Sequence, residues 1–338
     1  MASTKGLILA QLQFSAFPFS IVSFLQPLPN RTPKAYMSRE KGQVVTTGER
    51  RQRILDEIEA ASWVQDGMTI AVGSPAPMTL VRHIIRRGVK NLTVVDSGLS
   101  LDLLIAAGCV RKAVSYYAGG GFGVPVAPSF RRAAERGELD VWECEEGILT
   151  TGLQAAAQAL PFLPWRGGVG TSLPEVNPDL KVFRDPIRGE TLIAVPPIKP
   201  DVALLHAATA DAYGNVQHLG GPGWLDLFFY RAADRTIVQV EKIIPNEEVR
   251  ANPWATTIAG ADAIVRAPYG AHPFYSRGFY VQDSDHLRTY VEAATAATQE
   301  NRPEALTQYL NCYCREPATH GDYLERIGIK RLLSLYEY

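Results

Sequence analysis

The chain has 338 residues, a formal net charge of -1 and 46% hydrophobic residues, a composition typical of a globular protein long enough for one large or two medium α/β domains. The near-neutral charge excludes a protein whose main partner is nucleic acid, because such proteins carry a surplus of lysine and arginine. Four cysteines, none in a CxxC pair, predict reduced thiols of a cytoplasmic protein and give no zinc-ligand spacing.

The N-terminal segment differs from the rest of the chain. No acidic residue precedes Glu40, and the apolar run from Leu7 to Leu28 is interrupted by glutamine, serine and proline. The run is too interrupted for a membrane span, and it lacks the basic start and clear cleavage site of a signal peptide. We expect residues 1–45 to be an extension before a single domain at 46–338, either a disordered tail or sequence upstream of a true start at Met37. A targeting peptide is the alternative.

The segments that follow alternate between helices and strands. Apolar residues spaced at i, i+3 and i+4 predict a helix over residues 49–64. Four short apolar runs, each followed by a helical segment, then predict strands at 68–72, 92–95, 110–116 and 140–144. This alternation predicts an α/β fold: an open, mostly parallel, Rossmann-like sheet with flanking helices.

Small or acidic residues follow all four of these strands, with Asp96, Ser97 and Gly98 after the second. Gly73 and Ser74 come after the first, Gly119 and Gly120 after the third, and Glu146 after the fourth. Because the carboxyl ends of parallel strands meet at one edge of a sheet, we expect these loops to line a ligand site there. Bare glycine amides can point their N–H groups at negative charge. Each loop taken alone is equally compatible with an ordinary tight turn.

A helix predicted over residues 148–160 is followed by a glycine-rich turn containing Arg166, Gly167 and Gly168. Arg166 could hold a carboxylate or phosphate through two hydrogen bonds, although an exposed turn arginine is the alternative. Glu146, directly before this helix, is a candidate general base, since an apolar pocket or a neighbouring carboxylate raises the pKa of a carboxyl group.

The C-terminal half adds further elements and one more candidate residue. A long loop is predicted over 173–189, a helix over 224–233 and a helical tail over 285–323. Further strands are predicted at 191–195, 202–206, 236–240 and 263–267. His272, in a glycine- and proline-containing loop, could contact a substrate, although a structural loop histidine is the alternative. Glu241, directly after a strand, is a second candidate acid or base.

Four stretches occur in an order that resembles a known family: DGMTIAVG at 66–73, LPFLPWRGGVGT at 160–171, TIVQVEKII at 236–244 and APYGAHP at 267–273. They resemble the alpha (A) subunit of family I CoA-transferases, the glutaconate CoA-transferase group. The resemblance extends over residues 48–335. It implies a heteromeric CoA-transferase in which the thioester-forming glutamate belongs to the beta subunit, within a Ser-Glu-Asn-Gly-like motif that this chain lacks.

The resemblance also carries expectations about ligands and partners. It implies coenzyme A as a substrate without a metal, acyl-CoA and carboxylic acid substrates, and a beta (B) subunit in an α2β2 assembly without nucleic acid or membrane. The amides of Gly119, Gly120, Gly167 and Gly168 would line an oxyanion pocket. Ser74 replaces a glycine usual in the family.

Two alternatives to CoA transfer remain. The stretch around Glu146 also resembles a segment of the A subunits of steroid ring-cleaving hydrolases, which are similar to the transferases. In that reaction Glu146 would activate water for attack on a ring carbonyl of a CoA thioester. The second alternative is a non-catalytic scaffold subunit. A nucleotide-dependent oxidoreductase is disfavoured, because no GxGxxG follows a strand.

Overall fold

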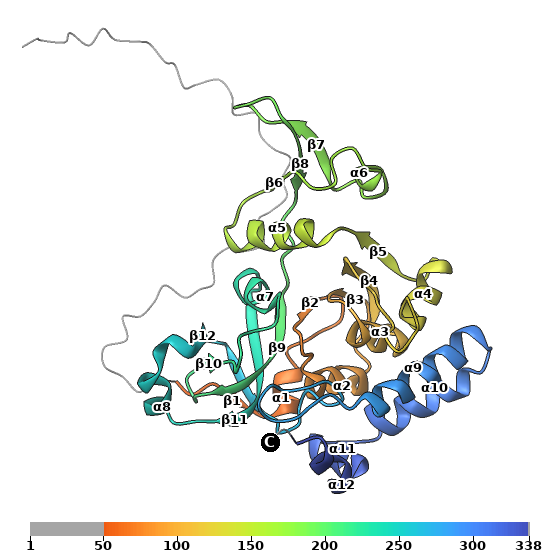
Figure 1. Ribbon diagram of the computed structural model, residues 1–338, viewed down its shortest axis with the longest axis vertical. Coiled ribbons are helices and arrows are strands. Elements are labelled where there is room, and N and C mark those ends of the chain that lie inside the picture. Colours follow the sequence, from red (N-terminus) through yellow and green to blue (C-terminus); the bar gives the residue numbers. More distant parts are fainter. Residues whose placement is uncertain (1–50, 337–338) are drawn as a thin grey trace, which may run out of the picture. The chain divides into compact units, whose positions relative to one another are not determined.

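The computed structural model describes residues 51–336, so the predictions for residues 1–45 and for a start at Met37 fall outside the described residues. These residues form a ten-stranded sheet and a separate three-stranded sheet (Figure 1). The main path of the large sheet is β1-β13-β11-β9-β2-β3-β4-β5, and all neighbours along it are parallel. The predicted α/β fold with an open, mostly parallel sheet is confirmed.

The bounds of the strands are as follows. The large sheet contains β1 (Ile54–Leu55), β2 (Thr69–Val72), β3 (Leu92–Val95), β4 (Val110–Ser115), β5 (Asp140–Glu143), β9 (Val202–Ala210), β10 (Asn215–Gln217), β11 (Arg235–Ile243), β12 (Thr256–Ala259) and β13 (Ala263–Arg266). Strand β10 lies off the main path and pairs antiparallel with β9 and β12. The small sheet is antiparallel, with β6 (Leu163–Trp165) and β7 (Lys181–Arg184) on either side of β8 (Thr191–Val195).

Alternating side chains along each strand create a core on both faces of the large sheet. On β2, Ile70 and Val72 belong to one buried cluster, whereas Ala71 belongs to the other. The first cluster includes residues of α1 (Glu57–Ala61), α2 (Met78–Arg87), α3 (Leu99–Ala106), α9 (Ser284–Gln299) and α10 (Pro303–Leu310). The second includes residues of α5 (Glu146–Ala157) and α7 (Asp226–Ala232). Burial on both faces explains why these strands are continuous apolar runs.

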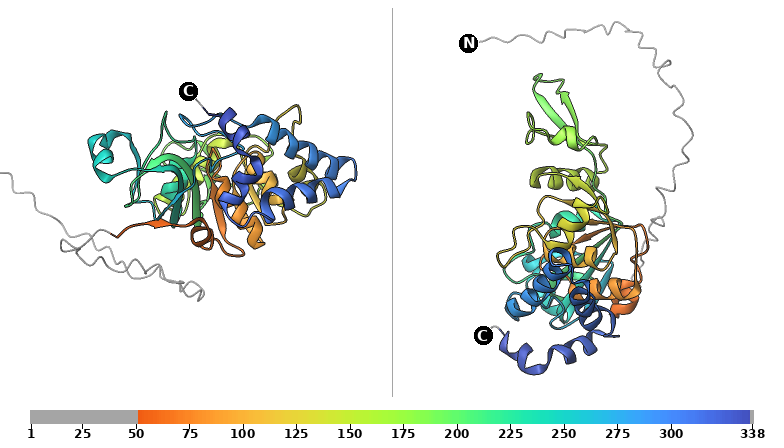
Figure 2. Two further views of the ribbon diagram at one scale, coloured as in Figure 1. Left: turned by 90° about the horizontal axis from the view of Figure 1, so that it is seen from below. Right: turned by 90° about the vertical axis from the view of Figure 1, so that its right-hand side faces the viewer.

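The remaining helices are short. They are α4 (Pro128–Glu135), α6 (Leu173–Val176), α8 (Asn246–Ala251), η1 (Pro253–Ala255), the π-helix η2 (Asn311–Arg315), α11 (His320–Ile327) and α12 (Ile329–Ser334). The predicted helical tail is therefore divided into several helices, and Figures 1 and 2 show α9 and α10 side by side. The small sheet packs through β6 and β8 against α5.

Two predicted elements are wrong. The helix expected over residues 49–64 is limited to α1, because Ile54 and Leu55 pair as β1 with β13, and the Asp56 carboxylate accepts the N–H groups of Ile58 and Glu59 as an N-cap. The loop expected over 173–189 contains α6 and β7, since the antiparallel partner β8 stabilises a strand whose own sequence pattern is weak.

Candidate functional site

The strands β2, β3, β4 and β5 are neighbours in the sheet and run in the same direction. Their following loops therefore lie at one edge, as the sequence predicts. Ser74 follows β2, Asp96 follows β3, Tyr116 follows β4, and Glu146 follows β5. This edge is where open α/β sheets bind ligands.

The Glu145 carboxylate caps the N-terminus of α5, and both of its oxygens accept hydrogen bonds. One carboxylate oxygen accepts the backbone N–H of Gly147 at 2.7 Å. The other accepts the N–H of Ile148 at 2.8 Å and the indole N–H of Trp165 at 2.6 Å. Glu145 thus caps the helix and ties it to β6, so its carboxylate has little capacity left for chemistry.

Glu146, the first residue of α5, differs from Glu145 in the exposure and the hydrogen bonding of its side chain. Its side chain is exposed and forms no hydrogen bond or ion pair with the other residues of the described region 51–336. It lies close enough to Tyr116 for its charge to add to the main effect, burial, in raising the pKa of that phenol. Asp96 acts on Tyr116 in the same direction. Glu146 is therefore a carboxylate available to a substrate or to another chain.

Asp96 and Tyr116 lie at this edge, although neither was predicted as a catalytic or substrate-binding residue. The Asp96 carboxylate accepts hydrogen bonds from the N–H of Ser97 and the hydroxyl of Ser100. Burial nevertheless raises the pKa of Asp96 to about 7. A carboxyl group that titrates near neutrality in a crevice is a common feature of functional sites. Its position at the end of a predicted strand was the only signal available in the sequence.

The predicted glycines fall into two groups. Gly167 and Gly168 lie against the start of α5: a Cβ added to Gly167 would be 3.2 Å from a Glu145 carboxylate oxygen, and one added to Gly168 would be 3.8 Å from Ile148 Cδ1. Gly119 and Gly120 are buried within their own loop. The structure thus brings Gly167 and Gly168 to the helix that carries Glu146, and it places Gly119 and Gly120 in the loop that begins at Tyr116.

Arg166 and His272 are bonded to residues other than Glu146. The Arg166 side chain is 74% exposed and pairs with Glu190. His272 is fully buried: Nδ1 lies 2.7 Å from the Tyr323 hydroxyl and Nε2 3.1 Å from the Asp283 carboxylate. Burial lowers the pKa of His272, which keeps the imidazole neutral. Its contacts join the loop after β13 to the C-terminal helices.

The start of α5 gives a prediction for stability. A Cβ on residue 147 would lie 2.2 Å from Trp165 Cζ2, so Gly147→Ala requires the indole ring to move. Overpacking of this kind costs roughly 1–3 kcal/mol, and the better helix propensity of alanine returns up to about 1 kcal/mol. We expect urea denaturation to show a loss of about 1–2 kcal/mol. In the control Gly321→Ala the new Cβ would meet only Thr319 Oγ1 at 3.5 Å, and an equal loss there would contradict the prediction.

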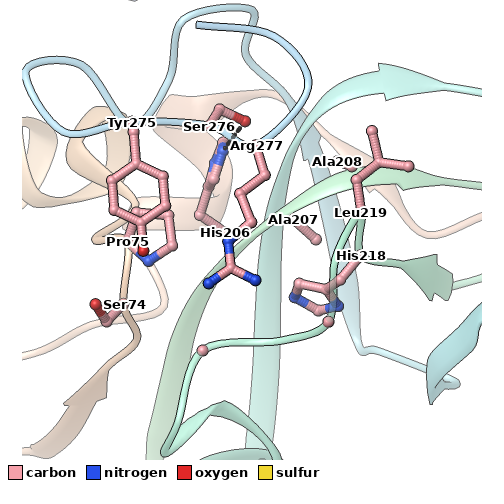
Figure 3. Close-up of a pocket in the computed structure, with 12 residues that line it drawn as sticks. Ser74, Pro75, His206, Ala207, Ala208, His218, Leu219, Tyr275, Ser276 and Arg277 are labelled. Atoms are coloured by element: carbon pink, nitrogen blue, oxygen red, sulfur yellow. Dashed lines mark hydrogen bonds between the residues drawn. The ribbon is translucent and has the colours of Figure 1, made fainter. Parts of the chain in front are cut away.

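A small pocket lies beside the end of β2 and the second half of β9 (Figure 3). Its volume is about 30 Å³. It is lined by Ser74, Pro75, His206, Ala207, Ala208, His218, Leu219, Gly221, Gly223, Tyr275, Ser276 and Arg277. Of the predicted site residues, Ser74 alone appears in this lining. The pocket is assembled from loops that are far apart in the sequence, so no local pattern identified it.

One wall of the pocket is a buried hydrogen-bond network around His206. Its Nε2 lies 2.9 Å from the Ser276 hydroxyl and 3.3 Å from the Glu241 carboxylate, and Gln239 lies 2.9 Å from Nδ1. Glu241 also accepts hydrogen bonds from the backbone N–H of Tyr269 and from the Tyr280 hydroxyl. Glu241, a candidate acid or base in the sequence, therefore fixes the pocket wall and the loop after β13.

The described residues contain neither a candidate metal site nor a helix that could span a membrane. Residues 51–336 contain no group of three or more His, Cys, Asp or Glu side chains arranged to hold a metal ion. Within the same residues, every helix is too short or too polar to cross a membrane.

Residues 55–266 match the Coenzyme A transferase family, and the chain belongs to that family. Its relatives include a cholesterol ring-cleaving hydrolase IpdA subunit from Mycobacterium tuberculosis, 36% identical over 282 residues that cover 78% of this chain and 93% of the relative. An uncharacterized protein of Archaeoglobus fulgidus is 36% identical over 289 residues. That match covers 82% of this chain and 63% of the relative, so the chain spans less than two thirds of that relative's length.

Among solved structures, glutaconate coenzyme A-transferase from Acidaminococcus fermentans is similar with a TM-score of 0.78 and 30% sequence identity. The match covers 85% of this chain and 96% of that chain. The family predicted from the four sequence stretches is confirmed, as is its relationship to both CoA-transferase and ring-cleaving hydrolase subunits.

Proposed function

We propose that this chain is the A subunit of a two-subunit enzyme that transfers coenzyme A between carboxylic acids. The observation that carries the proposal is the fold, which is similar to glutaconate coenzyme A-transferase with a TM-score of 0.78 over 85% of this chain. The carboxyl edge of the sheet, where Glu146 is exposed, is the candidate surface for the B subunit. Beside it, the loop after β4 exposes Tyr117, Phe122 and Val126, and exposed apolar side chains of this kind favour contact with another protein. Relatives named as A subunits of CoA-transferases support the same reading.

In the proposed reaction, a glutamate of the B subunit attacks the acyl-CoA carbonyl carbon and expels the CoA thiolate, forming an acyl-glutamyl anhydride. The thiolate then attacks the glutamyl carbonyl, which releases the free carboxylate and leaves a glutamyl-CoA thioester. The same steps in reverse pass coenzyme A to a second carboxylic acid. The amides of Gly119, Gly120, Gly167 and Gly168 are the groups we propose to stabilise the developing oxyanion.

Hydrolytic ring opening of a CoA thioester is the second candidate, and the free carboxylate of Glu146 is the observation that favours it. A CoA-transferase with its glutamate in the B subunit requires no carboxylate here, whereas a ring-opening hydrolase requires a base to activate water. The similarity to the IpdA subunit supports this candidate. Glu146 would remove a proton from water as the hydroxide adds to the ring carbonyl carbon. Collapse of the resulting alkoxide would break the adjacent ring C–C bond, giving a carboxylic acid and a carbanion that takes the proton back from Glu146.

Reconstitution with the B subunit tests the proposal. We expect the isolated full-length chain to show no turnover and the complex to exchange coenzyme A between an acyl-CoA and a free carboxylic acid. Mass spectrometry of the complex incubated with acyl-CoA should reveal a CoA adduct on a glutamate of the B subunit. Robust turnover by the isolated chain would overturn the proposal, as would exchange without any such adduct.

The remaining features of the proposal concern assembly and location. We propose an α2β2 complex, with coenzyme A entering as a substrate and without a metal ion. A cytoplasmic location rests on four cysteines whose spacing matches no disulfide or zinc pattern.

A further inference from the structure

Arg82 of α2 is a buried cation that forms no ion pair with a carboxylate of residues 51–336. The residue is 6% exposed, and its Nη1 donates a hydrogen bond to the His272 carbonyl oxygen at 2.9 Å. The guanidinium carbon lies 3.5 Å from the centre of the Tyr323 ring. Its Nη2 has no hydrogen-bond partner within the described part of the chain. Because a buried charge is costly unless it is paired, Arg82 indicates a position for a negatively charged group.

A second cavity, of about 10 Å³, lies at Arg82, where α2 meets the C-terminal helices. Its lining includes Arg82 and His83 of α2, Cys314 of η2, and Thr319 and His320 at the start of α11. It shares no lining residue with the pocket of Figure 3. A space of this volume holds about one atom of water size, so it admits a single small ion or a water molecule and excludes a phosphate group or an acyl chain.

The other titratable side chains that line this cavity are neutral at neutral pH. Burial raises the pKa of the Cys314 thiol to about 12, and it also raises the pKa of the Tyr323 phenol. Burial lowers the pKa of His83 to about 4 and that of His320 to about 3, and the charge of Arg82 adds to both effects. A thiol, a phenol and two neutral imidazoles surround the guanidinium, so none of them supplies the negative charge that would balance it.

The lining supplies hydrogen-bond donors and no carboxylate of the described residues. Nη2 of Arg82 carries two N–H groups that no described residue accepts. Thr319 Oγ1 accepts a backbone N–H at the start of α11 at 3.2 Å, which leaves its own hydroxyl proton available to an anion. Glu57 lies 4.0 Å from His83 Nε2, but it is not among the lining residues. The electrostatic character of the cavity is therefore positive.

We infer that this cavity binds a small monovalent inorganic anion of the size of chloride. The anion accepts hydrogen bonds from Arg82 Nη2 and from the Thr319 hydroxyl, and its charge balances the buried guanidinium. Because the lining comes from α2, η2 and α11, the bound anion joins these helices. An anion that binds only the folded chain stabilises it by mass action. The inference goes beyond the proposed function and does not depend on it, since the cavity is too small for a substrate.

Thermal unfolding of the full-length chain in sodium chloride and in sodium gluconate at equal ionic strength tests the site, because gluconate is too large for the cavity. We expect the Tm of the wild type to be about 2–4 °C higher in chloride. Arg82→Met removes the cation and keeps an unbranched side chain, and its Tm should differ by less than about 1 °C between the two salts. The control Arg87→Met removes an exposed arginine of the same helix that bonds to the Ala61 and Val64 carbonyl oxygens, and it should keep the chloride effect. A chloride effect of equal size in wild type and Arg82→Met would overturn the site.

Diffraction from wild-type crystals grown in sodium bromide tests the site even if Arg82→Met does not fold. Bromide replaces chloride and has an anomalous signal that water lacks. We expect one anomalous difference peak in the cavity, within hydrogen-bond distance of Arg82 Nη2. A water molecule in the cavity without anomalous signal, or bromide bound only elsewhere, contradicts the inference. A bromide peak in the cavity without any effect of chloride on the Tm would mean binding at crystal concentration only, and it would overturn the inference as well.

Discussion

The Glu146→Gln variant, assayed with its B subunit, is expected to lose ring-opening hydrolysis of a CoA thioester by about 10²–10⁴-fold in kcat while its transfer of coenzyme A changes by less than about threefold. Glutamine keeps the shape of the side chain and removes its ability to accept a proton from water. Glu146 is exposed at the start of α5, and its carboxylate has no hydrogen-bond partner among residues 51–336. Its replacement removes the group that we propose to take a proton from water. A single substitution therefore separates the two proposed chemistries, because hydrolysis is lost and transfer of coenzyme A is retained.

The matched control is Glu143→Gln. Glu143 is also exposed and lies at the end of β5, so its substitution changes the net charge by the same amount at nearly the same place. We expect both activities of this control to remain close to those of the wild type. Hydrolysis by the Glu146→Gln complex at the wild-type rate would rule out Glu146 as the base. If substitutions in the glycine loops also leave both activities unchanged, the chain is a scaffold subunit.

The contrast between Glu145 and Glu146 shows what a sequence alone can establish about this site. Their place after the fourth strand was predictable, because an apolar run followed by a helical segment locates the carboxyl end of a parallel strand. Adjacent residues at such a position tend to point to different sides. Which of the two is free depends on the indole of Trp165, which binds Glu145 from twenty residues further along the chain. That contact exists only once β6 has packed against α5.

The elements that the sequence predicted well are those buried on both faces of the sheet. Strands β2 to β5 are continuous apolar segments bounded by turns, and their parallel order follows from the intervening helices. The elements that it missed owe their form to a distant partner. Ile54 and Leu55 have the spacing of a helix but pair with Ile264 and Val265. Strand β7 forms at the edge of the small sheet, where it pairs with β8.

The pocket could not be predicted for the same reason. His218 and Arg277 are separated by about sixty residues, and neither belongs to a motif. His206 is buried within β9, but its contact with Ser276 makes it part of the pocket wall. Loops that converge on a site from separate segments leave no periodic signal in the sequence.

His272 leads to a second large effect, one on stability. Asp283 is buried and accepts hydrogen bonds from His272 Nε2 and from Arg331, and it caps α9 by accepting the N–H of His286. Because the carboxylate accepts from Nε2–H, the Tyr323 hydroxyl donates to Nδ1 of the same ring. Burial alone would raise the pKa of Asp283, but the hydrogen bonds from Arg331 and His272 lower it overall. One carboxylate thus joins the loop after β13 to α9 and α12.

We expect Asp283→Ala to lower the free energy of unfolding in urea by about 2–4 kcal/mol, because it leaves a buried His272 N–H unpaired (roughly 1–3 kcal/mol) and removes an N-cap (roughly 0.5–2 kcal/mol). The control Asp285→Ala removes a 71% exposed carboxylate that also contacts Arg331, and it should cost less than about 1 kcal/mol. Since the pKa of Asp283 is lowered on folding, its contribution is complete above the unfolded pKa of about 3.9 and falls as the pH drops below it. The gap between wild type and Asp283→Ala should therefore be constant from pH 8 to about pH 5 and shrink in stronger acid. Equal losses for the two variants at neutral pH would show that the contact with Arg331, and not the buried hydrogen bonds to His272 and α9, supplies the stability.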